Sequence, residues 1–130
     1  MQKVIAMFGE SEKGKYHVPY VFHSLEQLSN TLGEPPKDSF GLFYAIQALM
    51  YEREVIYFRV EDEGYSVEDY MIGLKFLKKK KSIKRLDALC MPKVGSKEII
   101  DATNPICLKF QSLIIINEND LFDYLLSKPF

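Results

Sequence analysis

Short runs of apolar residues alternate along the chain with segments in which apolar side chains recur every three or four positions. The runs are apolar throughout and are bounded by glycine, proline or polar residues, which is typical of buried strands; they span residues 4–8, 55–60, 86–91 and 113–116. Strands of this kind alternating with helices indicate a parallel sheet covered on both sides. We expect an α/β fold, a single three-layer domain over residues 1–130 with a mostly parallel sheet of about four strands and helices on both faces.

Local signals place the helices between these runs. Ser24 and Gln27 form a capping box before the first helix, which Gly33 ends. Residues 40–51 carry one apolar stripe at helical spacing. Ser66 is expected to cap a helix over residues 67–78, with acidic residues in its first turn. A fourth helix begins near Gly95-Ser96, and Asn104-Pro105 is expected to kink or split it; residues 121–126 form the last helix.

Composition narrows the class of protein. The apolar fraction of 47% and the charged fraction of 27% are ordinary for a folded globular chain, and the net charge is −1. This charge argues against a nucleic-acid partner for the chain as a whole. No apolar run reaches the roughly 18 residues of a membrane span. The N-terminus lacks the pattern of a signal peptide, so we expect a cytoplasmic protein.

The two cysteines, Cys90 and Cys107, lie in apolar surroundings without CxxC spacing. Buried thiols in a reducing compartment are the expectation, and a disulfide between them is the alternative.

One segment matches a phosphate-binding motif in its letters. Residues 9–15 satisfy G-x-x-x-x-G-K directly after a strand. Tyr16, however, stands where the motif needs Ser or Thr to hold Mg²⁺. Pro19 and its extended neighbours leave no room for the helix whose N-terminus should face the phosphates. We expect a solvated connecting loop here, with nucleotide binding as the alternative.

No arrangement in the sequence predicts catalysis. His17 and His23 have no nucleophile or orienting acid beside them, and no G-x-S-x-G elbow occurs. Metal ligation by these histidines with a cysteine would need an accidental spacing. Carboxylates at residues 61–63, with Glu68 and Asp69, could hold a divalent cation, although adjacent acids on a loop are usually solvated. We expect no catalytic residue, no cofactor and no metal.

The strongest charge feature is a basic run of seven cations within residues 75–85. A nucleic-acid patch usually interleaves aromatic residues with its cations, and only Phe76 is nearby. A charged helix terminus, a polyanion site and a protein interface are the three interpretations. The cations are Lys75, Lys78, Lys79, Lys80, Lys81, Lys84 and Arg85.

The expected sheet separates this basic run from the acidic residues. In a parallel α/β sheet, loops that follow strands gather at one end and loops that precede strands gather at the other. Glu61, Asp62 and Glu63 follow a strand, whereas the lysines precede one. Oppositely charged ends can meet head to tail and build rings or filaments. The predicted interface therefore comprises Lys78, Lys79, Lys80, Lys81, Lys84, Arg85, Glu61, Asp62 and Glu63.

Several short segments, in order, resemble the core domain of contractile tail sheath proteins of phages and related injection systems. Residues 6–14 resemble that family's strand followed by a Gly-x-(Ser/Thr)-x-x-Gly loop, and residues 19–33 its "Ser-x-x-x-Phe, Phe-Gly" segment. Residues 43–49 and 57–60 are similar to its Tyr-x-Ala-Val-x-x-Phe helix and Tyr-Val-Val-Arg-Val strand. Gly73-Leu74 and residues 86–95 resemble its Gly-Leu helix and Leu-x-x-x-Pro-Gly strand, with a stretched turn at residues 93–95.

This resemblance implies a subtilisin-like parallel sheet without a protease triad, in a subunit that forms stacked hexameric rings around a tube. The family also has an N-terminal arm and a C-terminal domain that link neighbours, and neither is recognisable here. We therefore expect a reduced form, such as a cap, terminator, baseplate or sheath-docking piece. Its partners would be copies of itself or other tail components, in the host cytoplasm or the virion. A stand-alone α/β binding or adaptor module is the alternative, followed by an enzyme or nucleotide binder.

Overall fold

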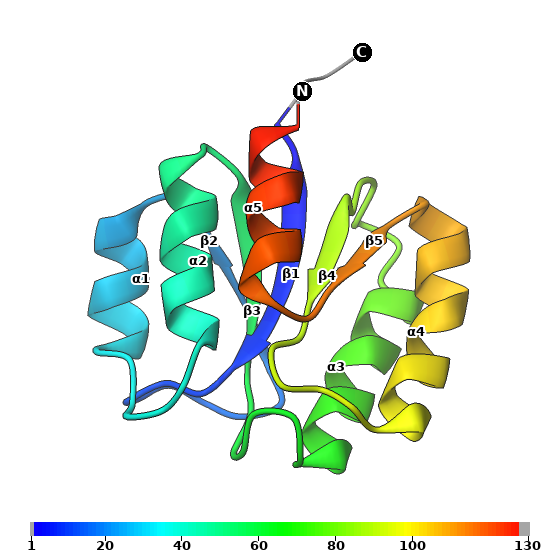
Figure 1. The fold of residues 1–130 in the computed structure, drawn as a ribbon, viewed down its shortest axis with the longest axis horizontal. Helices are drawn as coiled ribbons and strands as arrows, with labels where there is room; N and C mark the ends of the chain where they lie inside the picture. Colours follow the sequence, from blue (N-terminus) through cyan, green and yellow to red (C-terminus); the bar gives the residue numbers. More distant parts are fainter. Residues whose placement is uncertain (1, 128–130) are drawn as a thin grey trace.

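A mixed five-stranded sheet runs through the middle of the molecule in the order β2-β3-β1-β4-β5 (Figure 1). The computed structural model describes residues 2–127. Neighbours β1, β3, β4 and β5 are parallel, and β2 pairs antiparallel with β3. The strands are β1 (Val4–Gly9), β2 (Pro19–Phe22), β3 (Glu54–Arg59), β4 (Ala88–Cys90) and β5 (Leu113–Ile115). The predicted α/β class with a mostly parallel sheet is confirmed.

Five helices cover the two faces of this sheet. Buried residues of α1, α2 and α5 form one apolar cluster with one set of strand side chains. Buried residues of α3 and α4 form a second cluster with the other set. The helices are α1 (Leu25–Leu32), α2 (Gly41–Met50), α3 (Val67–Lys79), α4 (Lys97–Phe110) and α5 (Glu118–Leu126). Among residues 2–127, no helix combines the length and the apolar character needed to cross a bilayer.

Strand β1 is the centre of the core, because both of its neighbours are strands and both of its faces are covered. All six of its residues are buried. Side chains alternate along a strand, so Ile5 and Met7 join the cluster under α1, α2 and α5, while Ala6 and Phe8 join the cluster under α3 and α4. A continuous apolar run in the sequence is thus explained by burial on both sides.

The edge strand β2 corrects the expected strand number from about four to five. It pairs with β3 from Pro19 opposite Phe58 to Phe22 opposite Val55. Only Phe22 is buried in it, and Val21 is exposed, so it lacks the continuous apolar pattern of the other strands. Proline is tolerated here because it is the first residue of an edge strand.

The expected split of the fourth helix is wrong: α4 is continuous from Lys97 to Phe110 with Pro105 inside it. A proline within a helix removes one backbone hydrogen bond and strains the preceding turn. Pro105 is exposed. Its neighbours Ile99, Thr103 and Ile106 are buried. Packing of that buried face therefore holds the helix together across the missing bond.

The connection that follows β1 and the connection that follows β4 run over opposite faces of the sheet. The chain passes from β1 to β3 by way of α1 and α2, and from β4 to β5 by way of α4 on the other side (Figure 1). The carboxyl ends of the adjacent strands β1 and β4 therefore form a topological switch point, the place where open α/β sheets bind ligands. Any ligand site of this fold type is expected at that edge.

A close backbone approach joins β1 to α2 at this edge. A Cβ atom on Gly9 would lie 2.6 Å from the Cα atom of Gly41 and 2.5 Å from the hydroxyl of Tyr57. Real Cβ atoms do not approach backbone atoms this closely. Glycine is therefore required at position 9 for reasons of space.

The substitution Gly9→Ala is expected to destabilise the fold by about 1–3 kcal/mol, the usual cost of overpacking. Urea unfolding followed by circular dichroism measures the effect. Gly95→Ala is the matched control, because a Cβ on Gly95 would meet no atom within 4 Å. Equal stability of the Gly9 variant and the control would contradict the close approach.

Candidate functional site

A carboxylate of the protein itself is buried at the carboxyl end of β1, beside the switch point. Glu63, which is 1% exposed, follows β3 and extends its carboxylate to the N-terminus of α2. Its Oε1 accepts a hydrogen bond from the Phe40 N–H at 2.8 Å. Its Oε2 accepts from the N–H groups of Glu10 at 2.8 Å and Gly41 at 2.9 Å. Three backbone donors thus converge on one buried carboxylate.

This arrangement explains how an acid is tolerated in the core. Unpaired N–H groups at a helix N-terminus carry partial positive charge and favour an anion. Charge-assisted hydrogen bonds offset the desolvation of the carboxylate. In many α/β proteins a bound phosphate takes this position. Here Glu63 supplies the anion, so its expected place in a surface interface is wrong.

Two neighbouring groups complete the junction. The Glu63 N–H donates to Oε2 of Glu10 at 2.9 Å, and the Tyr57 hydroxyl donates to the Glu10 carbonyl at 2.8 Å. Burial raises the pKa of the Tyr57 phenol well above its ordinary value, and the nearby Glu63 charge raises it further. The phenol therefore remains a hydrogen-bond donor at any physiological pH.

The loop that carries Glu63 is held in one conformation by side chains of α3. Asp69 Oδ2 accepts from the Glu61 N–H at 2.8 Å, and the Tyr70 hydroxyl accepts from the Gly64 N–H at 2.7 Å. The Ser66 hydroxyl accepts from the Asp62 N–H and donates to the Asp62 carbonyl. Ser66 is therefore the N-cap residue by position only, and its predicted capping bond to α3 is absent.

This loop presents one aromatic ring among acids. Tyr65 is 70% exposed, and Glu61, Asp62 and Glu68 around it in sequence are exposed as well. We call residues 61–66 together with Glu68 the acidic loop. Sequence reasoning identified its carboxylates but not Tyr65. An aromatic residue placed between Gly64 and Ser66, outside any apolar run, was the available signal.

The basic residues lie at the opposite end, as predicted. Lys78 and Lys79 end α3, and Lys80, Lys81 and Lys84 follow it, all of them exposed. Lys84 and Arg85 border a hollow with Val4 and Glu54, the first residues of β1 and β3, and with Gln2. Arg85 has a structural contact: its Nε lies 2.9 Å from Oδ2 of Asp87, which also accepts from the Val4 N–H.

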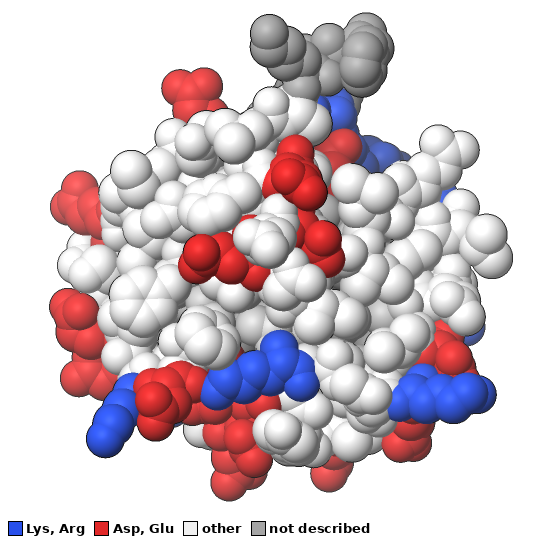
Figure 2. Space-filling model, in the orientation of Figure 1, with Lys and Arg blue, Asp and Glu red and all other residues white. Residues whose placement is uncertain are grey.

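The face formed by α2 and α5 separates these two ends. Figure 2 shows that acidic side chains gather in its centre, near α5, and along its lower edge, where the strands end. The exposed acids of α5 are Glu118, Asp120 and Asp123. Lysines are interspersed among those acids, so the carboxyl edge is acidic only in part. The cations of the α3 terminus are not on this face, because α3 covers the other side of the sheet.

The histidines form pairs that the sequence did not predict. Nε2 of His17 lies 2.6 Å from Oδ1 of Asp69, and Nε2 of His23 lies 3.2 Å from Oε1 of Glu54. They stand before and after β2 and therefore belong to opposite ends of that strand. Within residues 2–127, no group of three or more His, Cys, Asp or Glu side chains is arranged to hold a metal ion.

The segment that matches the phosphate-binding motif leads into β2 and not into a helix. Arg59 holds it from the sheet by donating to the carbonyls of Ser11 and Gly14. Its guanidinium also stacks on Tyr16, 4.3 Å from the ring centre. The expected connecting loop is thus tied to the sheet by Arg59 and to α1 by a bond from the Lys13 N–H to the Leu32 carbonyl.

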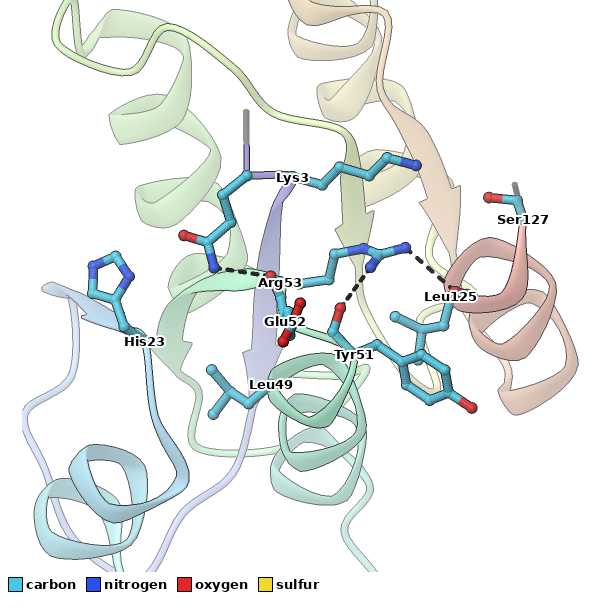
Figure 3. A pocket seen from close by; sticks show the side chains of 9 residues that line it. Lys3, His23, Leu49, Tyr51, Glu52, Arg53, Leu125 and Ser127 are labelled. Atoms are coloured by element: carbon cyan, nitrogen blue, oxygen red, sulfur yellow. Dashed lines mark hydrogen bonds between the residues drawn. The ribbon is translucent and has the colours of Figure 1, made fainter. Parts of the chain in front are cut away.

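A pocket of about 640 Å³ opens at the amino edge, beside the ends of α2 and α5 (Figure 3). Lys3, His23, Glu52 and Arg53 are its charged or titratable lining residues. Arg53 donates to the Tyr51 carbonyl at 2.7 Å and to the Leu125 carbonyl at 3.3 Å. These carbonyls lie at the negative ends of two helices, so the guanidinium ties the helices together.

Both cysteines are free thiols, as expected. Cys90 packs in the cluster under α1, α2 and α5, and Cys107 packs against the cluster on the other face. The sheet between the clusters keeps the two sulfur atoms apart. Burial raises the pKa of each thiol, most strongly for Cys90.

Comparisons with protein-family models, with curated proteins and with solved structures found no match to this chain. The functional interpretation therefore rests on three geometric features of the molecule. These are the Glu63 carboxylate buried at the N-terminus of α2, the exposed acidic loop and the basic terminus of α3.

Replacing Glu63 with Gln is expected to destabilise the fold by about 2–4 kcal/mol. The substitution loses hydrogen bonds to a charged acceptor, and it places the amide nitrogen of Gln, itself a donor, against a backbone N–H donor. Urea unfolding measures the change. Glu61→Gln is the control, because the Glu61 side chain is exposed and should change stability by less than about 0.5 kcal/mol. Similar small effects for both variants would refute the role of the Glu63 carboxylate.

The thiols are expected to differ in reactivity, because the thiolate is the reacting form and access limits attack. Iodoacetamide should alkylate half-buried Cys107 in the native protein and Cys90 only after unfolding. The raised pKa of Cys107 means that its rate should still be increasing above about pH 8.5, the ordinary thiol value. Peptide mass spectrometry identifies the modified residue, and rapid native labelling of Cys90 would contradict its burial.

Proposed function

We propose that the protein is a structural assembly subunit that acts through protein–protein contacts between its two charged ends. The observation that carries this proposal is the separation of Lys78, Lys79, Lys80, Lys81 and Lys84 from Glu61 and Asp62 at opposite ends of the sheet. A contact between unlike ends of two copies is heterologous, and repeating it builds a ring or a filament.

Electrostatics favour this orientation of two copies over others. Contacts between like ends would bring charges of the same sign together, whereas head-to-tail contacts pair lysines with carboxylates. Charges at an exposed rim mainly increase the association rate and fix the register. The association should therefore weaken as salt screens the two ends.

The buried position of Glu63 is consistent with a structural role. Glu63 takes the position in which an α/β domain of this topology would bind an anionic ligand. Tyr57 and Glu10 close the same junction. We accordingly assign no catalytic residue, cofactor or metal in this proposal.

The resemblance to the tail sheath core suggests the setting of this assembly. A mostly parallel sheet with helices on both faces is compatible with that family's core. Within this proposal, the protein works in a phage tail or a similar injection machine, as a reduced relative of the sheath subunit. Its partners are further copies or other tail components.

The adaptor interpretation also has an observation in its favour. Phe40, Phe43 and Phe122 border a groove of about 240 Å³ between α2 and α5, which Glu118 also lines, on the face shown in Figure 2. Exposed apolar patches of this kind often mark protein-binding surfaces. A monomeric protein that binds an unrelated partner through this face would be an adaptor and not an assembly subunit.

Light scattering on the purified protein, alone and mixed with candidate tail components, tests the proposal. We expect concentration-dependent oligomers or a stoichiometric complex at low salt. Reversing the charges of Lys78, Lys79, Lys80 and Lys81 to Glu should weaken self-association by about ten-fold or more, since close charge pairs couple by 1.5 kcal/mol or more.

The matched control adds Glu61→Lys and Asp62→Lys to the variant in which Lys78–Lys81 are Glu. Its two ends again carry opposite charges, with the signs exchanged relative to the wild type, so association should be restored. A strict monomer under all these conditions would contradict the proposal. So would unchanged self-association of the reversed variant.

A further inference from the structure

A groove between α3 and α4 combines an apolar floor with a cationic rim. Its volume is about 390 Å³. Met71 and Leu74 from α3 and Ala102 and Pro105 from α4 form the floor. Lys75, Lys78 and Lys79 form the rim. We call this feature the α3–α4 groove.

The rim lysines are not used inside the molecule. The ion pairs found within residues 2–127 join His17 to Asp69, His23 to Glu54, Arg85 to Asp87 and Lys97 to Asp101. All three rim lysines are exposed. Their positive charge is therefore available to a partner, and the apolar floor is available to an apolar side chain.

These two properties define the partner's chemistry. An aromatic or aliphatic side chain would fill the floor, and acidic residues on either side of it would face the lysines. The acidic loop of the same protein has this composition: Tyr65 is 70% exposed, and Glu61, Asp62 and Glu68 accompany it. Tyrosine also suits a half-wet groove, because its hydroxyl can remain in contact with water or a lysine.

The acidic loop is already ordered in the isolated chain. Asp69, Tyr70 and Ser66 fix its backbone through the hydrogen bonds described above, and Glu63 anchors it beneath. Gly64 adopts a φ of 89°, and its backbone packs against Lys93. A preorganised loop loses little conformational entropy when it docks, which favours binding.

We propose that Tyr65 of one copy inserts into the α3–α4 groove of the next copy. Glu61, Asp62 and Glu68 of the first copy then face Lys75, Lys78 and Lys79 of the second. This inference rests on the proposed head-to-tail assembly and identifies its contact. Because the loop and the groove are different surfaces, each bound pair keeps one free loop and one free groove for further copies.

The contact is expected to be weak for a single pair. One aromatic side chain buries on the order of 150–250 Å². Stable interfaces usually bury more than about 1,000 Å² in total, so surrounding contacts must add to it. Tyrosine is nevertheless a frequent hot-spot residue, and its loss should weaken the association by about ten-fold or more.

The loop and the groove can be removed separately. Tyr65→Ala removes the inserted ring. Lys75→Glu with Lys79→Glu reverses the rim at exposed positions that do not hold the fold. Phe43→Ala is the control for losing an exposed aromatic ring, and Lys13→Glu with Lys15→Glu is the control for the same charge change elsewhere.

Sedimentation velocity at low salt then measures assembly of each variant alone and of an equimolar mixture. Tyr65→Ala and the rim variant should each self-associate about ten-fold or more weakly than the wild type, and so be monomeric at a concentration at which the wild type assembles. Neither control should weaken assembly. The mixture should form a dimer and stop there, because the first variant keeps its groove and the second keeps its Tyr65. This dimer is the specific signature of the proposed contact.

Other outcomes overturn the inference in distinguishable ways. If both variants assemble like the wild type while reversal of Lys78–Lys81 still prevents assembly, the Tyr65 contact is wrong and the proposed function stands. A mixture that remains monomeric also overturns the contact. Binding of a different protein that needs the rim but not Tyr65 would assign the groove to that protein. A wild type that never self-associates and joins no tail component refutes both proposals.

Discussion

The buried carboxylate of Glu63 is the interaction on which the rest of this structure depends. It joins the end of β1, the N-terminus of α2 and the loop after β3 through hydrogen bonds from Glu10, Phe40 and Gly41. Removing the carboxylate would leave these wholly or partly buried donors without an acceptor, which is costly. The same interaction lies at the carboxyl end of β1, beside the switch point, and fixes the base of the loop that presents Tyr65. One acidic residue thus both occupies the usual ligand position and orders the surface that we propose as an interface.

The proposed function depends on where the exposed charged residues lie once Glu63 is buried. With Glu63 inside, the exposed acids Glu61 and Asp62 remain at the carboxyl edge, and the terminus of α3 carries the lysines to the amino edge. The direction of α3 along the sheet is what separates the two signs. A subunit with such ends can extend in one direction, and the α3–α4 groove gives that extension a defined geometry.

Most of the fold could be predicted from local pattern, because strands buried on both faces and helices with one apolar stripe leave strong signals. Strand β2 was missed as a member of the sheet because only Phe22 of its four residues is buried. The continuity of α4 through Pro105 depends on the packing of Ile99 and Ile106, and this tertiary packing cannot be deduced from the local sequence. The candidate site was harder to predict from the sequence than the fold. Nothing near Glu63 in sequence shows that it is buried, since its partners at positions 10, 40 and 41 are brought to it only by the fold.

In the proposed assembly, opposite ends of two copies meet, and zero-length crosslinking of carboxylates to amines tests this contact on the unmodified protein. An equimolar mixture of isotope-labelled and unlabelled chains distinguishes links between copies from links within one copy. We predict mixed-isotope peptides that join the loop containing Glu61, Asp62 and Glu68 to the segment containing Lys75, Lys78 and Lys79. Links between copies that connect other surfaces, with none between these two, would contradict the head-to-tail account.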